Sequence, residues 1–395
     1  MQPIIEAHKD IQLDMFRSYV VIFEWIKGID AAHAHSDNLM DERQVMDLTL
    51  RVAEEMKDKG FLVRDNKPHH IIVKPKKNGT LAKDRKGGIL YAVIDYELLV
   101  RTPGREESIK QVKRIKYHQK QKDRFLMSYS NNFPPQLRQV DIMGIDYIFG
   151  HVESTNGLLW VVGKDPDLFD YFLPERWEST PRTKLSEFHE IYYTLTKDYI
   201  NLVWKVSKVG IQPDMDPFKE DEKKILDYGF NSPFEEISIA LELSRRNVRT
   251  VYPRAIYMYG NKITISDSIF DKSRYVSHRK YLLPNGTPIL RKNHRYIIIW
   301  GYWNGPDERL ASKDGDYQEG INPLNAYKEG MISEEEYIAL LKTKKERLAK
   351  VGMEDLNLRG THLLLSLDSN SVLLRDKNGI PEMRVCNFEF LHKIR

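Results

Sequence analysis

Two distant segments of this chain place apolar residues at helical spacing and then end at a glycine. Residues 41–59 put valine, leucine and methionine side chains on one helical face, and Gly60 follows as a C-terminal cap. Residues 333–352 begin with Ser333 and, three positions later, Glu336, which is the capping-box pattern. The pattern therefore predicts two long amphipathic helices.

Each predicted helix is followed by two short apolar runs that predict a β-hairpin. After the first helix the runs are Ile71–Val73 and Tyr91–Ile94, and after the second they are Leu363–Leu365 and Arg384–Cys386. Lys-Asn-Gly, which favours a tight turn, lies between the two runs of each pair. The same order of helix and hairpin is thus predicted twice.

The two segments also correspond residue by residue. Seven positions between 60 and 99 carry the same or a related residue 292 positions later, without a gap. Such agreement over about 40 residues indicates two copies of one supersecondary unit. The first copy has acids at Asp65 and Asp95, whereas the second has Asn357 and Asn387. The loss of both charges suggests that one copy performs chemistry and the other is structural. The matched residues are Gly60 with Gly352, His70 with His362, Asp84 with Asp376, Gly87 with Gly379, Asp95 with Asn387, Glu97 with Glu389, and Leu99 with Leu391.

The middle third of the chain is richer in predicted strands. A hairpin is predicted around a Ser-Thr-Asn-Gly turn, and a helix is predicted where Ser232 is followed by proline and then Glu235. These elements predict an α+β protein with a β-rich middle. The expected strands lie in residues 144–163, 199–209, 250–258 and 296–302, and the expected helix runs from 232 to about 246.

Length and charge narrow the class of protein. A chain of 395 residues exceeds one compact core and suggests two or three domains. The 61 basic and 57 acidic residues nearly balance, which gives no general reason to expect nucleic acid or an anionic membrane as partner. No apolar run approaches about 18 residues and no signal-peptide pattern opens the chain, so a cytoplasmic location is expected. The single cysteine, Cys386, rules out an internal disulfide and predicts a buried structural thiol.

Several segments of the first copy occur in the order known from protein kinases. Residues 63–73, Val-Arg-Asp-Asn-Lys-Pro-His-His-Ile-Ile-Val, resemble the catalytic loop H-R-D-L-K-P-x-N-I-L-L, with Asp65 and Lys67 at its acid and lysine. The Asp-Tyr-Glu sequence that begins at Asp95 resembles the metal-binding D-F-G element, and the segment around Glu24 resembles the hinge between two lobes. The chain thus resembles the protein-kinase-like superfamily, in two tandem degenerate copies.

The resemblance continues into the second copy through the middle third. Val-Trp-Lys, ending at Lys205, resembles the strand whose lysine holds phosphates, and Glu235 or Glu236 is its expected ion-pair partner. The resemblance implies three parts. They are a first copy without its small lobe in residues 1–140, a small lobe in 141–300 and a shortened large lobe in 301–395.

The chain also departs from the family pattern. His70 replaces the asparagine of the loop, and imidazole suits zinc or manganese better than magnesium. Its recurrence as His362 favours a structural hydrogen bond. No G-x-G-x-x-G occurs, and residues 150–157 are at best a loose substitute. Only about 18 residues precede the first hinge, so its small lobe would come from residues 143–300, from a second chain or from sequence outside this one. The neighbouring histidines His33, His35 and His69 show no metal-ligand spacing, and no zinc site is expected.

The resemblance implies a phosphotransferase that uses ATP and Mg²⁺ on an unknown protein or small molecule. Asp65 with Lys67 would be catalytic, and Asp95 with His70 would hold the metal. The nucleotide would be bound by Lys205, Glu235, Glu236 and Glu24.

Two alternatives remain open. Asn357 and Asn387 favour a non-catalytic, pseudokinase-like binding or scaffold protein, because an amide cannot accept a proton as a carboxylate can. The basic segment 105–124 could bind the phosphates of nucleic acid, but near-neutral overall charge makes this the least favoured function.

Overall fold

The computed structural model describes residues 24–96, 98–126, 133–187, 189–262, 273–303, 320–368 and 370–394. By its contacts the chain divides into two compact units, Met1–Val112 and Lys113–Arg395, which are called here the first and second unit. Both mix helices with strands, so the expected α+β class is confirmed. The expected parts 141–300 and 301–395 both lie in the second unit. No helix in the described ranges is long and apolar enough to cross a membrane.

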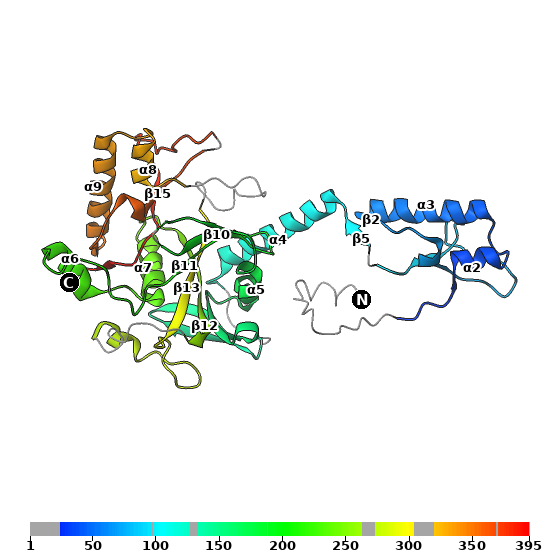
Figure 1. The fold of residues 1–395 in the computed structure, drawn as a ribbon, viewed down its shortest axis with the longest axis horizontal. Helices are drawn as coiled ribbons and strands as arrows, with labels where there is room; N and C mark the ends of the chain where they lie inside the picture. Colours follow the sequence, from blue (N-terminus) through cyan, green and yellow to red (C-terminus); the bar gives the residue numbers. More distant parts are fainter. Residues whose placement is uncertain are drawn as a thin grey trace. The chain divides into compact units, whose positions relative to one another are not determined.

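The first unit packs two helices against short strands (Figure 1). Strand β3 pairs with β1 on one side and β4 on the other, and β2 pairs separately with β5. Its small core includes Leu48, Val52, Ile71 and Val73. The elements are β1 (Ile29–Asp30), α2 (Ala31–Ser36), α3 (Glu42–Asp58), β2 (Phe61–Val63), the 3-10 turn η1 (Pro68–His70), β3 (Ile71–Val73), β4 (Tyr91–Val93) and β5 (Leu99–Arg101), followed by α4 (Pro103–Asp123), which continues into the second unit.

An eight-stranded antiparallel sheet forms the centre of the second unit. Its strand order is β6-β7-β8-β12-β13-β11-β10-β9. The strands are β6 (Leu137–Ile142), β7 (Ile145–Val152), β8 (Gly157–Val162), β9 (Arg182–Lys184), β10 (Ile191–Leu195), β11 (Asn201–Val206), β12 (Tyr252–Lys262) and β13 (His294–Gly301). Helical segments between them are η2 (Glu153–Thr155), η3 (Pro166–Phe172), α5 (Pro174–Trp177), α6 (Glu220–Tyr228), α7 (Pro233–Arg245) and η4 (Ser273–His278).

Both faces of this sheet are buried. On β8, Trp160 packs in one hydrophobic cluster with Phe234 of α7. The next residue, Val161, packs in the opposite cluster with Phe172 of η3. Because successive side chains on a strand point to opposite faces, a strand covered on both sides needs apolar residues throughout. This accounts for the continuous apolar runs of β8 and β13.

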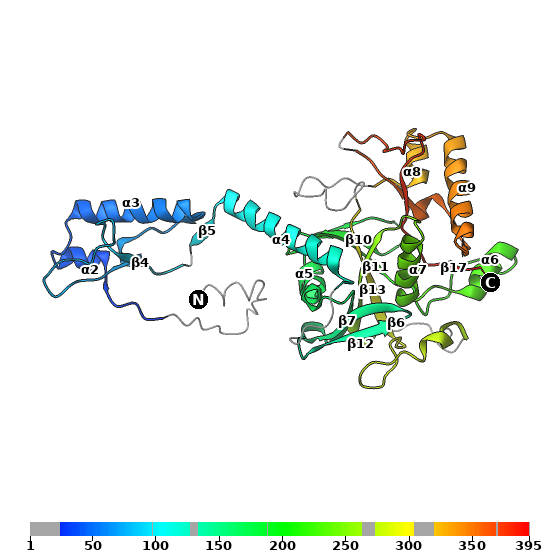
Figure 2. The same cartoon turned by 180° about the vertical axis from the view of Figure 1, so that it is seen from behind.

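The second unit ends in elements that match those of the first. Every helix and strand from α2 to β5 has a counterpart of the same type and length 292 residues later in the sequence. Even the pairing of Ile29 with Val73 recurs as a bridge between Ile321 and Leu365. Figure 2 shows α8 and α9 side by side, with β17 near α7. The counterparts are α8 (Pro323–Lys328), α9 (Glu334–Lys350), β14 (Met353–Asp355), η6 (Gly360–His362), β15 (Leu363–Leu365), β16 (Met383–Val385) and β17 (Leu391–Lys393).

Local sequence signals account for the ends of these helices. Asp41 caps α3 and Ser333 caps α9, each in a complete capping box. Gly60, with φ of +86°, follows α3 in a left-handed conformation that other residues rarely adopt. Both long helices and both hairpins predicted from the sequence are confirmed.

Candidate functional site

A buried lysine lies between two carboxylates in the second unit. Lys205 projects from β11, and its Nζ lies 2.7 Å from Oε2 of Glu236, which is in the first turn of α7. The same Nζ lies 3.4 Å from Oε1 of Glu389. The three side chains are 6% exposed or less. The structure therefore brings together the expected lysine and one of the two expected glutamates, and it adds a third group.

The charges of this cluster depend on one another. Burial opposes the charge of Lys205, but the two carboxylates outweigh it and raise the pKa of the lysine. Burial raises the pKa of Glu236, whereas Lys205 and its neighbours lower that of Glu389 despite its burial. The lysine charge is thus balanced inside the protein by two acids, which leaves little positive charge to offer to a phosphate.

Glu235, the other expected partner of Lys205, has a different role. Its Oε2 accepts a hydrogen bond from the backbone N–H of Ser232 at 2.7 Å, and its Oε1 pairs with Arg274 at 2.7 Å. Consecutive residues of a helix point about 100° apart, so only one of two neighbours can face the sheet. Of the two glutamates expected as partners of Lys205, Glu236 therefore makes the ion pair and Glu235 does not.

The loop expected to substitute for a glycine-rich phosphate loop lies elsewhere. Gly150 and Gly157 are in β7 and β8, and β12 and β13 separate β8 from the strand of Lys205. At Gly157 a Cβ atom would meet the carbonyl oxygen of Met258 at 2.7 Å, so this glycine permits close packing of strands. Residues 150–157, which were at best a loose substitute for that loop, therefore do not lie beside the strand of Lys205.

The hairpin on the Lys205 side of the sheet is β9–β10, which sequence reasoning missed. Residues 185–190 join its strands and contain no glycine. They include the half-buried His189, whose pKa is lowered by burial and by Lys208. Strand β9 has only three residues, all exposed and polar, so it lacks the apolar alternation by which strands are recognised.

Asparagines of the second unit serve in turns. The side-chain oxygen of Asn387 accepts a hydrogen bond from the N–H of Glu389 at 2.9 Å, and that of Asn357 accepts one from Arg359 at 2.7 Å. Next to Asn387 in the chain, the buried ring of Phe388 stacks on Trp300 with centroids 5.2 Å apart. These contacts stabilise the turns and use the amide oxygens locally.

Four expected site residues of the first unit lie together. The Nζ of Lys67 is 2.7 Å from Oδ2 of Asp65. His70 links the two acids, since its Nδ1 lies 3.1 Å from the backbone oxygen of Asp65 and its Nε2 lies 3.4 Å from Oδ2 of Asp95. A carbonyl oxygen only accepts, so Nδ1 is the donor to Asp65. The hydrogen-bonding role expected for His70 is thus present, and its role as a metal ligand stays a prediction.

The backbone at Asp95 adopts a conformation that is uncommon outside glycine. Its φ is +60°, in the left-handed region. Such backbone conformations cluster at functional sites, where the surrounding structure holds them. The carboxylates of Asp95 and Asp65 are 41% and 28% exposed, so both are accessible to a ligand.

Two further predictions fall at the edge of what the structure describes. Glu24 is exposed and lies outside any strand, and its nucleotide-binding role stays a prediction. The preceding hinge residues up to 23, and Glu97, are outside the described residues. The counterpart of Glu97 is Glu389, whose contact with Lys205 shows one reason for a glutamate at this position.

The predicted basic helix is present as α4, and part of its charge is used within the second unit. Lys113 pairs with Asp198 at 3.4 Å, and Lys120 lies 2.7 Å from Asp167. Arg114 is buried and its Nε donates to the backbone oxygen of Tyr199 at 2.6 Å. These three basic side chains contact groups of the second unit, so their charge is used within the fold and does not form a phosphate-binding surface.

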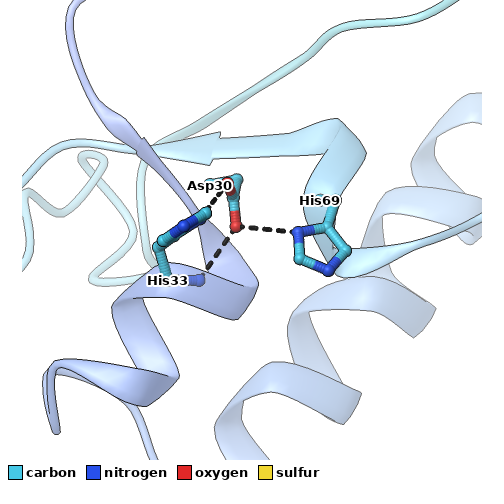
Figure 3. Close-up of side chains that lie close together, drawn as sticks. All are labelled: Asp30, His33 and His69. Atoms are coloured by element: carbon cyan, nitrogen blue, oxygen red, sulfur yellow. Dashed lines mark hydrogen bonds and ion pairs between the residues drawn. The ribbon is translucent and has the colours of Figure 1, made fainter.

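A cluster that the sequence reasoning missed lies at the start of α2. Asp30, His33 and His69 meet there (Figure 3), although no group with metal-ligand spacing was expected among these histidines. Asp30 and His33 are three residues apart on one helix turn, which is a weak signal in sequence. His69 is distant along the chain, so only the tertiary structure brings it to the other two.

Comparisons with known proteins add no family. No family model matches this chain, and no curated protein matches it either. The resemblance to protein kinases consequently depends on the residues and geometry of this chain alone.

Proposed function

We propose that this chain is a kinase-like protein whose first unit transfers a phosphoryl group from ATP with Mg²⁺, and whose second unit is a non-catalytic copy. One observation carries the proposal. Two sets of elements with the same lengths and strand pairing hold Asp65 and Asp95 in the first unit but Asn357 and Asn387 in the second. In the second unit the amide oxygens of Asn387 and Asn357 accept the local hydrogen bonds, so this local structure does not itself need carboxylates at these positions.

The chemistry assigns a role to each acid of the first unit. Phosphoryl transfer needs a group that accepts the proton of the substrate hydroxyl and acids that hold Mg²⁺ at the phosphates. Asp65, ion-paired with Lys67, would accept the proton, and Asp95 would bind the metal. His70, which hydrogen-bonds the backbone oxygen of Asp65 and has its Nε2 3.4 Å from Oδ2 of Asp95, would keep these acids in a constant arrangement.

The second unit lacks these groups, and its lysine is already balanced. Lys205 faces Glu236 and Glu389, so a nucleotide phosphate would have to compete with two buried carboxylates. Displacing a partner from a buried ion pair costs several kcal/mol. We infer that this cluster is a structural contact of the second unit and not a phosphate-binding site.

The first unit presents apolar residues where the second unit buries them. Tyr96 and Leu98 are 46% and 51% exposed, whereas their counterparts Phe388 and Phe390 are at most 4% exposed. In the second unit these rings pack on Trp300 and Phe230. This difference supports a first unit that works together with a small-lobe-like surface, which its described residues do not include.

The test measures transfer of labelled phosphate from ATP by the full chain in the presence of Mg²⁺. We expect Asp65→Asn and Asp95→Asn, which install the residues of the second unit, to lower product formation strongly. Asp41→Asn is the matched control, because it also removes one acid of the first unit but keeps a helix cap. Equal activity of Asp95→Asn and the wild-type chain would exclude the proposed role.

A non-catalytic scaffold is the second candidate function, and the balanced charge of Lys205 is the observation that favours it. It predicts no labelled product and no stabilisation by nucleotide. A nucleotide-binding protein would instead gain about 2.7 kcal/mol of unfolding free energy at a ligand concentration one hundred times Kd. Thermal unfolding with and without Mg²⁺–ATP therefore separates a binding protein from a scaffold that binds no nucleotide.

A further inference from the structure

Three side chains with metal-binding atoms converge at the N-terminus of α2, outside the proposed catalytic residues (Figure 3). Asp30 ends β1, His33 lies in the first turn of α2, and His69 lies on η1. The Nδ1 atoms of His33 and His69 are 2.5 Å and 3.3 Å from the carboxylate oxygens of Asp30. One ligand atom from each residue lies within 4.8 Å of the other two.

These spacings suit a single metal ion. Zinc binds histidine nitrogen and carboxylate oxygen at about 2.0–2.1 Å, so ligand atoms of a tetrahedral site are ~3.4 Å apart. The 3.3 Å between His69 and Asp30 is close to this value. The 2.5 Å between His33 and Asp30 is a direct hydrogen bond, which would lengthen by rotation of the exposed imidazole when a metal ion replaces its proton. The side chains of His33 and His69 are 70% and 63% exposed, so a bound ion would keep positions open to solvent.

The corresponding place in the second unit shows which part of the cluster the fold requires. Asn322, the counterpart of Asp30, caps α8 by accepting a hydrogen bond from the N–H of Asn325 at 2.9 Å. Asp30 caps α2 in the same way, accepting from the N–H of His33 at 2.9 Å. An asparagine therefore satisfies the helix, and the counterparts of the two histidines are Asn325 and Thr361. The carboxylate and both imidazoles exceed what this local structure needs.

From this geometry we propose that Asp30, His33 and His69 bind one divalent transition-metal ion of the zinc class. Two imidazoles and one carboxylate favour zinc, cobalt or ferrous iron, whereas magnesium prefers oxygen ligands in an octahedral shell. The site is separate from the proposed catalytic acids. Although His69 and His70 are neighbours on η1, His69 faces Asp30 and His70 faces Asp95.

The test titrates Zn²⁺ and Co²⁺ into the metal-free full chain by calorimetry and by the visible absorption of bound Co²⁺. We expect one tight ion per chain. His33→Asn and His69→Thr install the residues of the second unit and should each weaken binding at least tenfold. Asp30→Asn keeps the helix cap but removes the anionic ligand, and it should weaken binding as well.

Two matched variants serve as controls. His35→Gln removes the other histidine of α2, whose Nδ1 contacts the backbone oxygen of Met40 at 2.9 Å, and should leave metal affinity unchanged. Asp95→Asn should also leave it unchanged, which separates this site from phosphoryl transfer. Circular dichroism without metal verifies that each variant is folded. Unchanged affinity in both histidine variants, or an equal loss with His35→Gln, would overturn the proposal.

Discussion

Lys205 Nζ lies 2.7 Å from Glu236 Oε2, joining the central sheet of the second unit to α7. Both groups are buried, and Glu389 approaches the same lysine at 3.4 Å. A buried charge that loses its partner is strongly destabilising, while the pair as a whole contributes modestly. The stability of the second unit should therefore depend on which of the three groups is removed.

Lys205→Met should be more damaging than Glu236→Gln. The first leaves two buried acids without a cation and should cost about 3–5 kcal/mol of unfolding free energy. The second should cost less, because Lys205 keeps Glu389 and a glutamine oxygen can still accept a hydrogen bond. Urea unfolding of the full chain, followed by tryptophan fluorescence, measures both. The reverse order of the two costs would contradict this account.

Because of Lys344, the free energy of unfolding of the second unit should be higher at pH 9 than at pH 6. This lysine of α9 is 1% exposed, and burial together with Arg347 lowers its pKa to about 7. In the unfolded chain the pKa of Lys344 is near 10.5. Between about pH 7 and 10.5 this side chain is therefore more protonated in the unfolded chain than in the folded one. The contribution of Lys344 to stability therefore rises between about pH 7 and 10.5.

Replacing this lysine should remove that pH dependence. Lys344→Met keeps the apolar stem, and the counterpart in the first unit is the buried Val52, so the fold accepts an apolar residue here. We expect a gain of more than about 1 kcal/mol at pH 6, where the buried lysine is charged. The exposed Lys342→Met is the control and should change little. Urea unfolding at pH 6 and pH 9 measures the free energy of unfolding of both variants. Equal effects of Lys344→Met and Lys342→Met would contradict the prediction.

Corresponding apolar positions of the two units should differ in their sensitivity to truncation. Phe390 is 4% exposed and packs on Phe230 with ring centroids 4.7 Å apart, so Phe390→Ala should cost about 3–5 kcal/mol. Leu98, its counterpart, is 51% exposed, and Leu98→Ala should change stability by about 0.5 kcal/mol or less. Thermal unfolding compares them. A large loss in Leu98→Ala would mean that a second surface covers it.

The two acids of the first unit should fail in different ways if the proposed function holds. Asp65→Asn should lower kcat about 10²–10⁴-fold, as the loss of a general base does, without changing the Mg²⁺ requirement. Asp95→Asn should raise the Mg²⁺ concentration that gives half-maximal rate. Steady-state kinetics at several Mg²⁺ concentrations distinguish the two. An identical Mg²⁺ dependence in both variants would disprove separate roles.

Local elements could be predicted because their signals lie within a few residues. The capping boxes at Asp41, Ser232 and Ser333 and the glycine after α3 mark helix ends through hydrogen bonds between neighbours along the chain. The same holds for hairpins whose turns contain Lys-Asn-Gly. The positions matched at a constant offset of 292 likewise indicated two copies of one unit, and the structure shows helices and strands of equal length at both places.

Contacts between segments that are distant in the sequence could not be predicted and follow only from the tertiary structure. Sequence placed Glu235 and Glu236 side by side, but the rotation of α7 against the sheet selected Glu236 for Lys205. Strand order, which no local pattern encodes, put the β9–β10 hairpin on the Lys205 side and the Gly157 hairpin at a distance. The meeting of His69 with Asp30 belongs to the same class. Hydrogen bonds between chain neighbours determine helices and turns, whereas burial of apolar surface determines which distant side chains meet.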